Sequence, residues 1–388
     1  MQDFDPLKPE TLDSPHEEYH RLRSQCPVAH SDAWGGFWAL TRYDDVANAA
    51  SDSDNFITSV QNVVPKVAFT GRRPPLHLDP PEHTPYRRAL APLLTAKQVA
   101  RFEPVIRDIC NDLLDRMLEQ GGGDICNEYS APMPIRTFAH WMNLPDEQIE
   151  ILAEVGRRYN FAVQSDDEQE TKESSALLYD MARNLVLDRK KNPLDPAIDA
   201  TSALLAARAE GEPLPDEMIV GTIRQVLVVG IIAPTVLIGS IAVHLSEHPD
   251  LQQKLRDDLS LVPAAIEEFL RLYTPYRGFA RTPAKDICLR GRDIKKDEPI
   301  ALVYAAANRD PEVFERPDEF ILNRPNIKDS LAFGRGVHGC LGATLARLEL
   351  IVALECLLVR TNSFEVNGPV RLTRMPEIGA LSVPLTFS

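Results

Sequence analysis

The chain has 388 residues, of which 44% are hydrophobic and 26% charged, fractions typical of soluble globular proteins rather than collagenous or disordered chains. The 57 Asp and Glu outnumber the 42 Lys and Arg, giving a formal charge of −15. This charge argues against binding to nucleic acids or to anionic membranes. The six cysteines include no Cys-x-x-Cys pair, and the first residues show no export signal, so we expect a reduced, cytoplasmic protein.

Taken in chain order, the expected elements are mostly helices. They are a strand and turn over 36–45, an amphipathic helix over 97–119, a polar loop or helix end over 165–174, helices over 176–189 and 201–208, a long apolar helix from about 215, a short helix over 264–272, strands within 281–303, a Pro-rich meander over 310–325 and a final helix over 341–360. No repeat or flexible linker divides the chain. The pattern predicts a mainly α protein with small β-sheets, folded as a single domain over 1–388.

The stretch 226–243 carries no charged side chain and is long enough to span a membrane. A helix that is apolar on every side is either such a span or the buried centre of a large domain. Pro234, Thr235, Gly239 and Ser240 interrupt the stretch, and it occurs once, in mid-chain. These features favour the buried helix.

The window 331–347, with the sequence LAFGRGVHGCLGATLAR, is the most informative part of the chain. Its glycines allow a tight loop that a partner can approach closely, and Cys340 follows them at the start of a predicted helix. The free N–H groups and dipole of a helix start stabilise a thiolate, which is a ligand for a soft metal or for haem iron. A buried structural cysteine, a zinc site and a Cys340–His338 nucleophile pair are the alternatives. Zinc would need further Cys or His ligands nearby, and the i, i+2 spacing is awkward for the nucleophile pair.

This window resembles the haem-binding loop of the cytochrome P-450 superfamily, Phe-Gly-x-Gly-x-His-x-Cys-x-Gly. All six defining positions match, namely Phe333, Gly334, Gly336, His338, Cys340 and Gly342. The resemblance implies that Cys340 is the proximal ligand of a haem b (iron protoporphyrin IX). It further implies the P-450 fold, in which the haem lies between the long central helix and the Cys-ligand loop and helix.

Other windows resemble the same family in the same order along the chain. Glu268 and Arg271 resemble its Glu-x-x-Arg pair, with spacing that places both on one helix face, and Arg324 falls where a third arginine often braces that pair. The segment 307–311 resembles the start of the family's meander. The resemblance implies haem-propionate contacts from four residues, namely His83, Arg87, Arg281 and His338.

The long apolar helix departs from the family pattern Ala/Gly-Gly-x-Asp/Glu-Thr. Ile232 replaces the acid and Ala233 replaces the threonine, while Thr235 lies about 200° further round the helix. Pro234 has no N–H, so we expect a kink and a carbonyl of Gly230 without its helical partner. One hypothesis is that this carbonyl holds water for proton delivery, helped by Thr235 or the substrate. The alternative is that Pro234 only bends a buried helix and that oxygen activation is poor.

The resemblance also places a substrate pocket around the segment 61–69, the long helix and the segment 277–279. The residues chosen for this pocket are Val63, Val64, Val67, Val229, Ile232, Ala233, Gly278 and Phe279. Their mostly apolar character implies a small, largely hydrophobic substrate. Arg277 either pairs with a substrate carboxylate or is exposed, and exposure is the commoner outcome for an arginine. Tyr159 and Phe161 either roof the pocket or pack a helix end.

The resemblance implies a monooxygenase that uses O2 to hydroxylate or O-dealkylate its substrate. No flavin or iron–sulfur motif is evident, so electrons would come from a ferredoxin and ferredoxin reductase, unless the chain belongs to a longer fusion. A ferredoxin would need a local basic patch, for which the candidates are Arg335, Arg347, Lys97 and Arg101. The alternatives are a peroxide-driven or oxidative-coupling enzyme of the same fold, and a haem-based binder or sensor without turnover.

Overall fold

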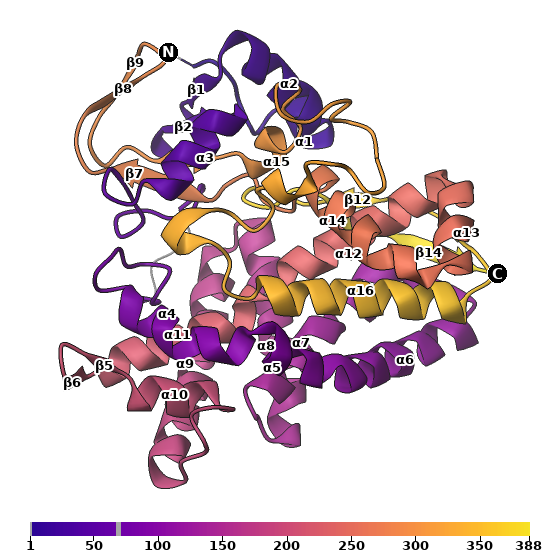
Figure 1. Cartoon of the computed structure of the whole chain (residues 1–388), viewed down its shortest axis with the longest axis horizontal. Helices are drawn as coiled ribbons and strands as arrows, with labels where there is room; N and C mark the ends of the chain where they lie inside the picture. Colours follow the sequence, from indigo (N-terminus) through magenta and orange to yellow (C-terminus); the bar gives the residue numbers. More distant parts are fainter. Residues whose placement is uncertain (1, 67–70) are drawn as a thin grey trace. The chain divides into compact units, whose positions relative to one another are not determined.

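The computed structural model describes residues 2–66 and 71–388, and its contacts divide the chain into two compact units, each assembled from separate stretches of sequence (Figure 1). Unit 1 draws its described residues from Met1–Val67, Ala264–Cys340 and Leu372–Gly379. Unit 2 draws them from Ala68–Pro263, Leu341–Arg371 and Ala380–Ser388.

Unit 1 is built on a five-stranded sheet with the strand order β1-β2-β10-β7-β3. The strands are β1 (Val28–Ser31), β2 (Phe37–Leu40), β3 (Phe56–Ile57), β7 (Ala280–Pro283) and β10 (Ile300–Leu302). β10 runs parallel to β2, while the other neighbouring pairs are antiparallel. A hairpin formed by β8 (Ile287–Leu289) and β9 (Arg292–Ile294) leaves this sheet.

Side chains that alternate along the strands of unit 1 contribute to two different hydrophobic clusters. Ala39 and Ala301 face one cluster, and their neighbours Leu40 and Leu302 face the other, as expected for a pleated strand buried on both sides. Helices cover both faces. The helices of unit 1 are α1 (Pro9–Asp13), α2 (Pro15–Gln25), α3 (Tyr43–Ser51), α15 (Tyr304–Ala307) and most of α14 (Val262–Leu272), with 3-10 turns η1 (Ala33–Gly35), η6 (Ile327–Asp329) and η7 (Gly336–His338).

Unit 2 is predominantly helical. Its helices are α4 (Thr84–Leu90), α5 (Ala96–Val99), α6 (Glu103–Glu119), α7 (Pro132–Trp141), α8 (Asp146–Ser165), α9 (Glu168–Lys191), α10 (Ala200–Ala206), α11 (Asp216–Val229), α12 (Ile232–Glu247), α13 (Pro249–Asp257) and α16 (Ala343–Arg360). Shorter turns are η2 (Ala91–Leu94), η3 (Ala100–Phe102), the π-helical η4 (Ile125–Ser130) and η5 (Leu259–Leu261). Figure 1 shows α16 running along α6, and the two helices pack together.

The remaining strands are short. In unit 2, β11 (Phe364–Val366), β14 (Pro384–Phe387) and β4 (Gly122–Asp124) form an antiparallel sheet, and β5 (Arg208–Ala209) pairs with β6 (Glu212–Pro213). β13 (Ala380–Ser382) packs on α12, and β12 (Arg371–Leu372) lies where the chain passes from unit 2 to unit 1. The predicted mainly α fold with small sheets is confirmed.

The apolar stretch 226–243 forms the end of α11 and most of α12. It lies within the single helical segment of the described residues that passes a length and hydropathy test for a membrane span, and 67% of its apolar window is buried in the protein. Burial of this extent supports the buried-helix interpretation. The segment is interrupted at Gly230 and Ile231, just before Pro234, as the missing N–H of proline predicts.

Two predicted boundaries need correction. The single helix expected over 97–119 is three elements, α5, η3 and α6, because Pro104 lies in the first turn of α6 and starts a new helix there. The polar stretch 165–174 is mostly helical, since α9 begins at Glu168 and the carboxylate of Asp167 caps it by accepting from the backbone N–H of Glu170 at 3.0 Å. The other expected elements form within a few residues of their predicted limits.

Candidate active site

Cys340 ends a loop in unit 1 that is closed by its own backbone. The N–H of Cys340 donates to the carbonyl of Phe333 at 2.8 Å, and the N–H of Gly339 donates to the carbonyl of Gly336 at 3.0 Å. Gly334 and Gly336 have φ values of 68° and 72°, a region that side chains with a Cβ rarely adopt. The glycine positions of the motif are therefore required by the turn that presents Cys340.

The loop is also fixed to its surroundings in unit 1. A Cβ on Gly336 would lie 2.5 Å from the carbonyl oxygen of Ala50 in α3, so only glycine allows this approach. The ring Nε2 of His338 lies 3.3 Å from the hydroxyl of Thr58. These contacts place the loop without using the thiol of Cys340.

The surroundings of Cys340 fit a cysteine that would bind haem iron. The side chain is exposed, the residues on either side of it are half-buried, and α16 begins three residues later at Ala343. Across residues 2–66 and 71–388, no group of three or more His, Cys, Asp or Glu could hold a metal ion. The zinc alternative therefore has no ligand set in the described part of the chain, whereas a haem iron needs a single protein thiolate on its proximal side.

The residues expected at the haem propionates are arginine and histidine donors on short elements, some in unit 1 and some in unit 2. In unit 1, Arg281 is buried in β7 and donates to the carbonyl of Ala280 at 2.9 Å. Burial raises the pKa of the nearby Tyr304 phenol, and Arg281 opposes that rise. In unit 2, His83 is buried at the start of α4, and Arg87 is half-buried one turn later in the same helix. The i, i+4 spacing of His83 and Arg87 therefore places both residues on the same side of the helix.

The carboxylate of Glu268 forms the centre of a buried ion network in unit 1. It accepts from Arg271 Nε at 2.9 Å and Nη2 at 2.8 Å, and from Arg324 Nε at 2.9 and 3.1 Å. The backbone N–H of Ile321 adds a fifth bond at 3.0 Å. The predicted pair and the predicted bracing role of Arg324 are both confirmed. Arg271 also donates to backbone carbonyls of the meander, so the network ties that segment to α14.

The break in the long helix lies at Gly230. A Cβ on Gly230 would overlap the ring of Phe138 in α7, so the helix needs glycine there. Pro234 has no N–H to donate to the Gly230 carbonyl. Directly before the break, the Val229 side chain is 48% exposed, although its neighbour Val228 is buried.

The hydroxyl of Thr235 is engaged by the backbone of unit 2. It donates to the carbonyl of Ile231 at 2.8 Å, with the carbonyl of Ser130 at 3.2 Å as a second acceptor. A hydroxyl has one proton to donate, so Thr235 serves its own helix turn and the neighbouring η4. This geometry favours the carbonyl of Gly230 over Thr235 as the group that would organise a water.

The expected pocket residues gather in two sets. In unit 1, Val63 bridges Phe279, and the N–H of Val64 donates to the carbonyl of Gly278 at 2.8 Å. In unit 2, the set is Val229, Ile232 and Ala233, at the end of α11 and the start of α12. Val67 lies outside the described residues.

The exposure expected for Arg277 is wrong. Its side chain is buried, donates from Nε to the carbonyl of Glu377 at 2.8 Å and reaches the carbonyl of Thr373 at 3.4 Å, so it is a structural arginine of unit 1. Phe161 is 65% exposed on α8 and packs no helix end. Tyr159 is buried beneath the guanidinium of Arg224, whose Cζ lies 4.5 Å from the ring centroid.

A family model described as Cytochrome P450 matches residues 158–384. The chain is 32% identical over 360 residues to Cytochrome P450 107B1 of Saccharopolyspora erythraea, covering 89% of this chain and 87% of the relative. The chain belongs to the cytochrome P450 family. This P450 is also 31% identical over 361 residues to the mycinamicin IV hydroxylase/epoxidase of Micromonospora griseorubida, covering 90% and 88% of the two chains. Its fold superposes on that of Cytochrome P450 CYP109Q5 from Chondromyces apiculatus with a TM-score of 0.88, at 28% identity and 98% and 97% coverage.

Membership identifies the protein as a haem-thiolate enzyme of the P450 monooxygenase family, which uses O2, an organic substrate and a redox partner. The residues described above suit that cofactor, with an exposed cysteine on a loop closed by its backbone, arginine and histidine donors, and an exposed valine at the helix break. Sequence reasoning missed Arg73, Arg224 and Tyr179, which form a buried group with Tyr159 in unit 2. The available signal was Arg224, a charge within the apolar pattern of α11.

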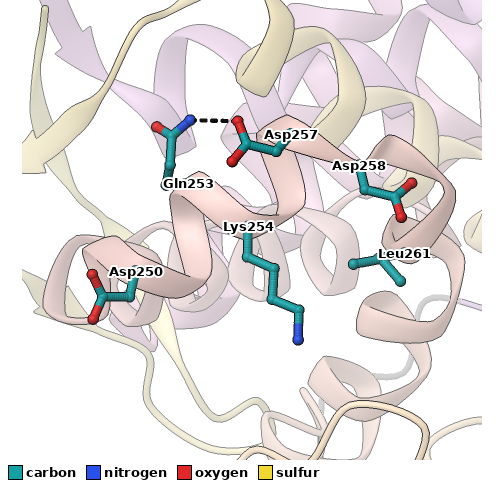
Figure 2. A pocket seen from close by; sticks show the side chains of 6 residues that line it. All are labelled: Asp250, Gln253, Lys254, Asp257, Asp258 and Leu261. Carbon is teal, nitrogen blue, oxygen red and sulfur yellow. Dashed lines mark hydrogen bonds between the residues drawn. The ribbon is translucent and has the colours of Figure 1, made fainter.

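A surface hollow elsewhere in unit 2 has no part in this site. Figure 2 shows it along α13 and the turn that follows, lined by Asp250, Gln253, Lys254, Asp257, Asp258 and Leu261. Most of these side chains are exposed and charged, and none belongs to the expected haem or substrate positions. Gln253 donates to Asp257 at 2.7 Å within the hollow. We therefore assign it to the ordinary solvated surface.

Proposed function

We propose that this P450 carries haem b on Cys340 and inserts one oxygen atom from O2 into a small, largely hydrophobic organic substrate, by hydroxylation or oxidative O-dealkylation. The observation that carries the proposal is the loop ending at Cys340, closed by its backbone and fixed by Gly336 on α3. When bound there, haem supplies the activation of dioxygen. His83 and Arg87 in unit 2, and Arg281 and His338 in unit 1, would hold the propionates. Phe333, Gly334 and Gly342 would shape the loop around the thiolate.

The first experiment is the absorption spectrum of the reduced protein with carbon monoxide. We expect the red-shifted Soret band of a thiolate-ligated complex, and its loss in Cys340→Ala. Cys288→Ala is the matched control, because Cys288 is also exposed but lies in the β8–β9 hairpin. A band typical of histidine ligation in the wild type, or an unchanged spectrum in Cys340→Ala, would contradict the proposal.

Proton delivery in this P450 would rely on the carbonyl of Gly230. Pro234 leaves that carbonyl without its helical donor, Ala233 supplies no hydroxyl, and Thr235 donates to backbone carbonyls. A water on the free carbonyl would stand in for the one that an acid and a threonine organise. Pro234→Ala restores an N–H at this position and should lower the fraction of electrons that reach product. Full turnover with tight coupling in Pro234→Ala would leave proline with only a bending role.

Electrons would come from a ferredoxin and its reductase in the cytoplasm. In unit 2, Lys97 and Arg101 are exposed near α16, which carries the half-buried Arg347. In unit 1, Arg335 is exposed next to the Cys340 loop. Charge reversal at Lys97 or Arg101 should slow reduction by an acidic ferredoxin, and added salt should have the same effect. Equal rates at low and high salt would exclude electrostatic docking.

One observation favours a second candidate. With Ile232 at the acid position and Ala233 at the alcohol position, a peroxide-driven or oxidative-coupling enzyme would not need the usual delivery of two protons. Turnover with hydrogen peroxide alone, at a rate above that with ferredoxin and reductase, would select this alternative. If haem binds but neither system yields product across a substrate screen, the non-catalytic binder or sensor remains.

A further inference from the structure

Four aromatic and cationic side chains form a buried group inside unit 2, referred to here as the Arg–Tyr cluster: Arg73, Tyr159, Tyr179 and Arg224. Arg224 on α11 is fully buried, and Arg73, three residues after the undescribed segment, is 9% exposed. The guanidinium of Arg224 lies 4.5 Å from the ring centroid of Tyr159 on α8 and 5.7 Å from that of Tyr179 on α9.

The cluster holds several polar atoms that have no hydrogen-bond partner. Nε of Arg73, Nε and Nη1 of Arg224 and the hydroxyl of Tyr179 are buried without one, as far as residues 2–66 and 71–388 show. Arg224 Nη2 donates to the Ser175 hydroxyl at 2.8 Å, Arg73 Nη1 lies 3.4 Å from the side-chain oxygen of Gln225, and both guanidinium groups also donate to the Tyr159 hydroxyl. Buried donors without acceptors are costly, and here four of them occur within one group of neighbouring side chains.

The charge of the cluster is not balanced within the described chain. None of the described carboxylates forms an ion pair with Arg73 or Arg224, although arginines are rarely buried without an anion. His77 lies close enough to Arg73 and Arg224 to be affected by their charges. Burial, followed by the charges of Arg73 and Arg224, lowers its pKa to about 3, so it is neutral at physiological pH. Two buried positive charges therefore remain, beside the neutral ring of His77.

Close backbone packing fixes the segment that carries Arg73. A Cβ on Gly221 of α11 would overlap the carbonyl of Arg72, so glycine lets the segment lie directly on that helix. A Cβ on Gly71, whose φ is 144°, would overlap the Tyr179 hydroxyl. Arg73 is thus held by neighbours on two helices, as expected for a preorganised binding group rather than a surface side chain.

We propose that Arg73 and Arg224 bind the carboxylate of an organic-acid substrate, with the Tyr179 hydroxyl as a further donor. The inference rests on the proposed monooxygenase function and narrows its substrate to apolar molecules that end in a carboxylate. The planar fork of a guanidinium matches two carboxylate oxygens. A carboxylate carries a single charge, which costs less to bury than the two charges of a phosphate monoester and leaves the cluster with one positive charge.

The position of Arg224 sets the length of the substrate. Arg224 precedes Gly230 by six residues, which is about 9 Å along a helix axis. A substrate whose carboxylate binds Arg224 and whose other end reaches the helix break and its exposed Val229 would therefore need an apolar chain of that order. Decanoate is long enough to cover this distance, and decanol has the same chain without the charge.

The test compares the binding of decanoate and decanol to the haem-loaded protein. Binding is measured by the Soret spin-state shift and, independently of haem, by the rise in the thermal unfolding midpoint. We expect wild-type protein to bind decanoate more tightly than decanol by about tenfold or more, since buried charge-assisted hydrogen bonds are strong. Arg224→Gln and Arg73→Gln should each reduce that ratio to near one while decanol binding persists.

The matched control is Arg183→Gln. Arg183 lies on α9 and its Cζ is 5.7 Å from the Tyr179 ring, but it is exposed and pairs with Asp180 at 3.2 Å. It should leave the acid-to-alcohol ratio unchanged. Haem content and the carbon monoxide spectrum check folding. If Arg224→Gln fails to fold, Arg73→Gln, which removes a less buried group, decides the outcome.

Three results would overturn the inference. One is equal affinity for decanoate and decanol in wild-type protein, or binding of neither. Another is an acid preference that survives both arginine variants. The last is a tyrosinate absorption band at neutral pH that is lost in Tyr159→Phe, because an ionised Tyr159 would itself be the counter-charge. Arg73 and Arg224 do lower the pKa of Tyr159. In each case a normal carbon monoxide spectrum would leave the monooxygenase proposal intact. Conversely, an abnormal spectrum together with a retained rise of the unfolding midpoint by decanoate would contradict the monooxygenase proposal and leave the carboxylate-binding inference intact.

Discussion

Replacing Arg324 with methionine should destabilise the protein strongly, because it removes half of the charge that surrounds Glu268. Arg324 donates to both carboxylate oxygens and also to the carbonyls of Glu315 at 2.5 Å and Glu319 at 3.0 Å. Methionine fills a similar volume but offers no donor. Removing one partner of a buried ion pair costs about 3–5 kcal/mol, and we expect a loss in that range.

Glu268→Gln should cost more than Arg324→Met. Without the carboxylate, Arg271 and Arg324 become two buried positive charges that face one neutral amide. After Arg324→Met, in contrast, Glu268 and Arg271 still form a neutral pair, and the N–H of Ile321 still donates to it. Which of the two variants loses more stability therefore tests the charge balance of the network, and the size of each loss tests how much the network contributes.

The assay is urea unfolding of the haem-loaded protein, followed by far-UV circular dichroism and by Soret absorbance, with the slope compared between variants. Arg316→Met is the control, because Arg316 lies in the same meander but pairs with Glu319 on the surface, at 3.1 Å with both side chains more than half exposed. It should change stability by less than about 0.5 kcal/mol. A loss below about 1 kcal/mol in Arg324→Met, or a milder effect of Glu268→Gln, would refute the reasoning.

Three further predictions follow from buried or crowded positions. Burial raises the pKa of Glu349 well above its ordinary value of 4.5, so the folded protein holds a proton that the unfolded chain has lost. The free energy of unfolding should therefore fall as pH rises from about 4.5. Glu349→Gln should remove this pH dependence from the urea midpoints measured between about pH 5 and pH 8. Gly230→Ala should lower the melting temperature through a clash of about 1–3 kcal/mol with Phe138, and Phe138→Leu should restore most of the loss if the clash is the cause. Gly336→Ala should lower the haem-to-protein absorbance ratio, because its positive φ and its contact with Ala50 both oppose a side chain; an unchanged ratio would show that the loop tolerates a Cβ.

The sequence predicts best where spacing alone determines geometry. Glu268 and Arg271 are one helix turn apart, so a pair on one face follows from α-helical periodicity, and the glycines before Cys340 indicate a tight loop wherever it lies in the fold. The break near Gly230 could be predicted because proline removes a specific hydrogen bond. The start signal at Pro104 was equally local, and it was overlooked because the apolar pattern runs through it.

The Arg–Tyr cluster could not be predicted in this way. Arg73 and Arg224 are 151 positions apart, and their meeting depends on how α8, α9 and α11 pack, which no local pattern encodes. Arg277 shows the same limit, because its partners Thr373 and Glu377 lie about a hundred residues away and turn an apparently available charge into a structural one. Propensity and motif spacing describe neighbours along the chain, whereas burial of charge is decided by tertiary contacts.

The interruption at Gly230 also changes the electrostatics of the long apolar segment. A continuous helix cancels the peptide dipoles along its interior and leaves partial charges at its two ends alone. Because α11 ends at Val229 and α12 begins at Ile232, a negative carbonyl end and a positive amide end lie next to each other in mid-segment. A stretch whose side chains are almost all apolar therefore carries backbone polarity at its middle.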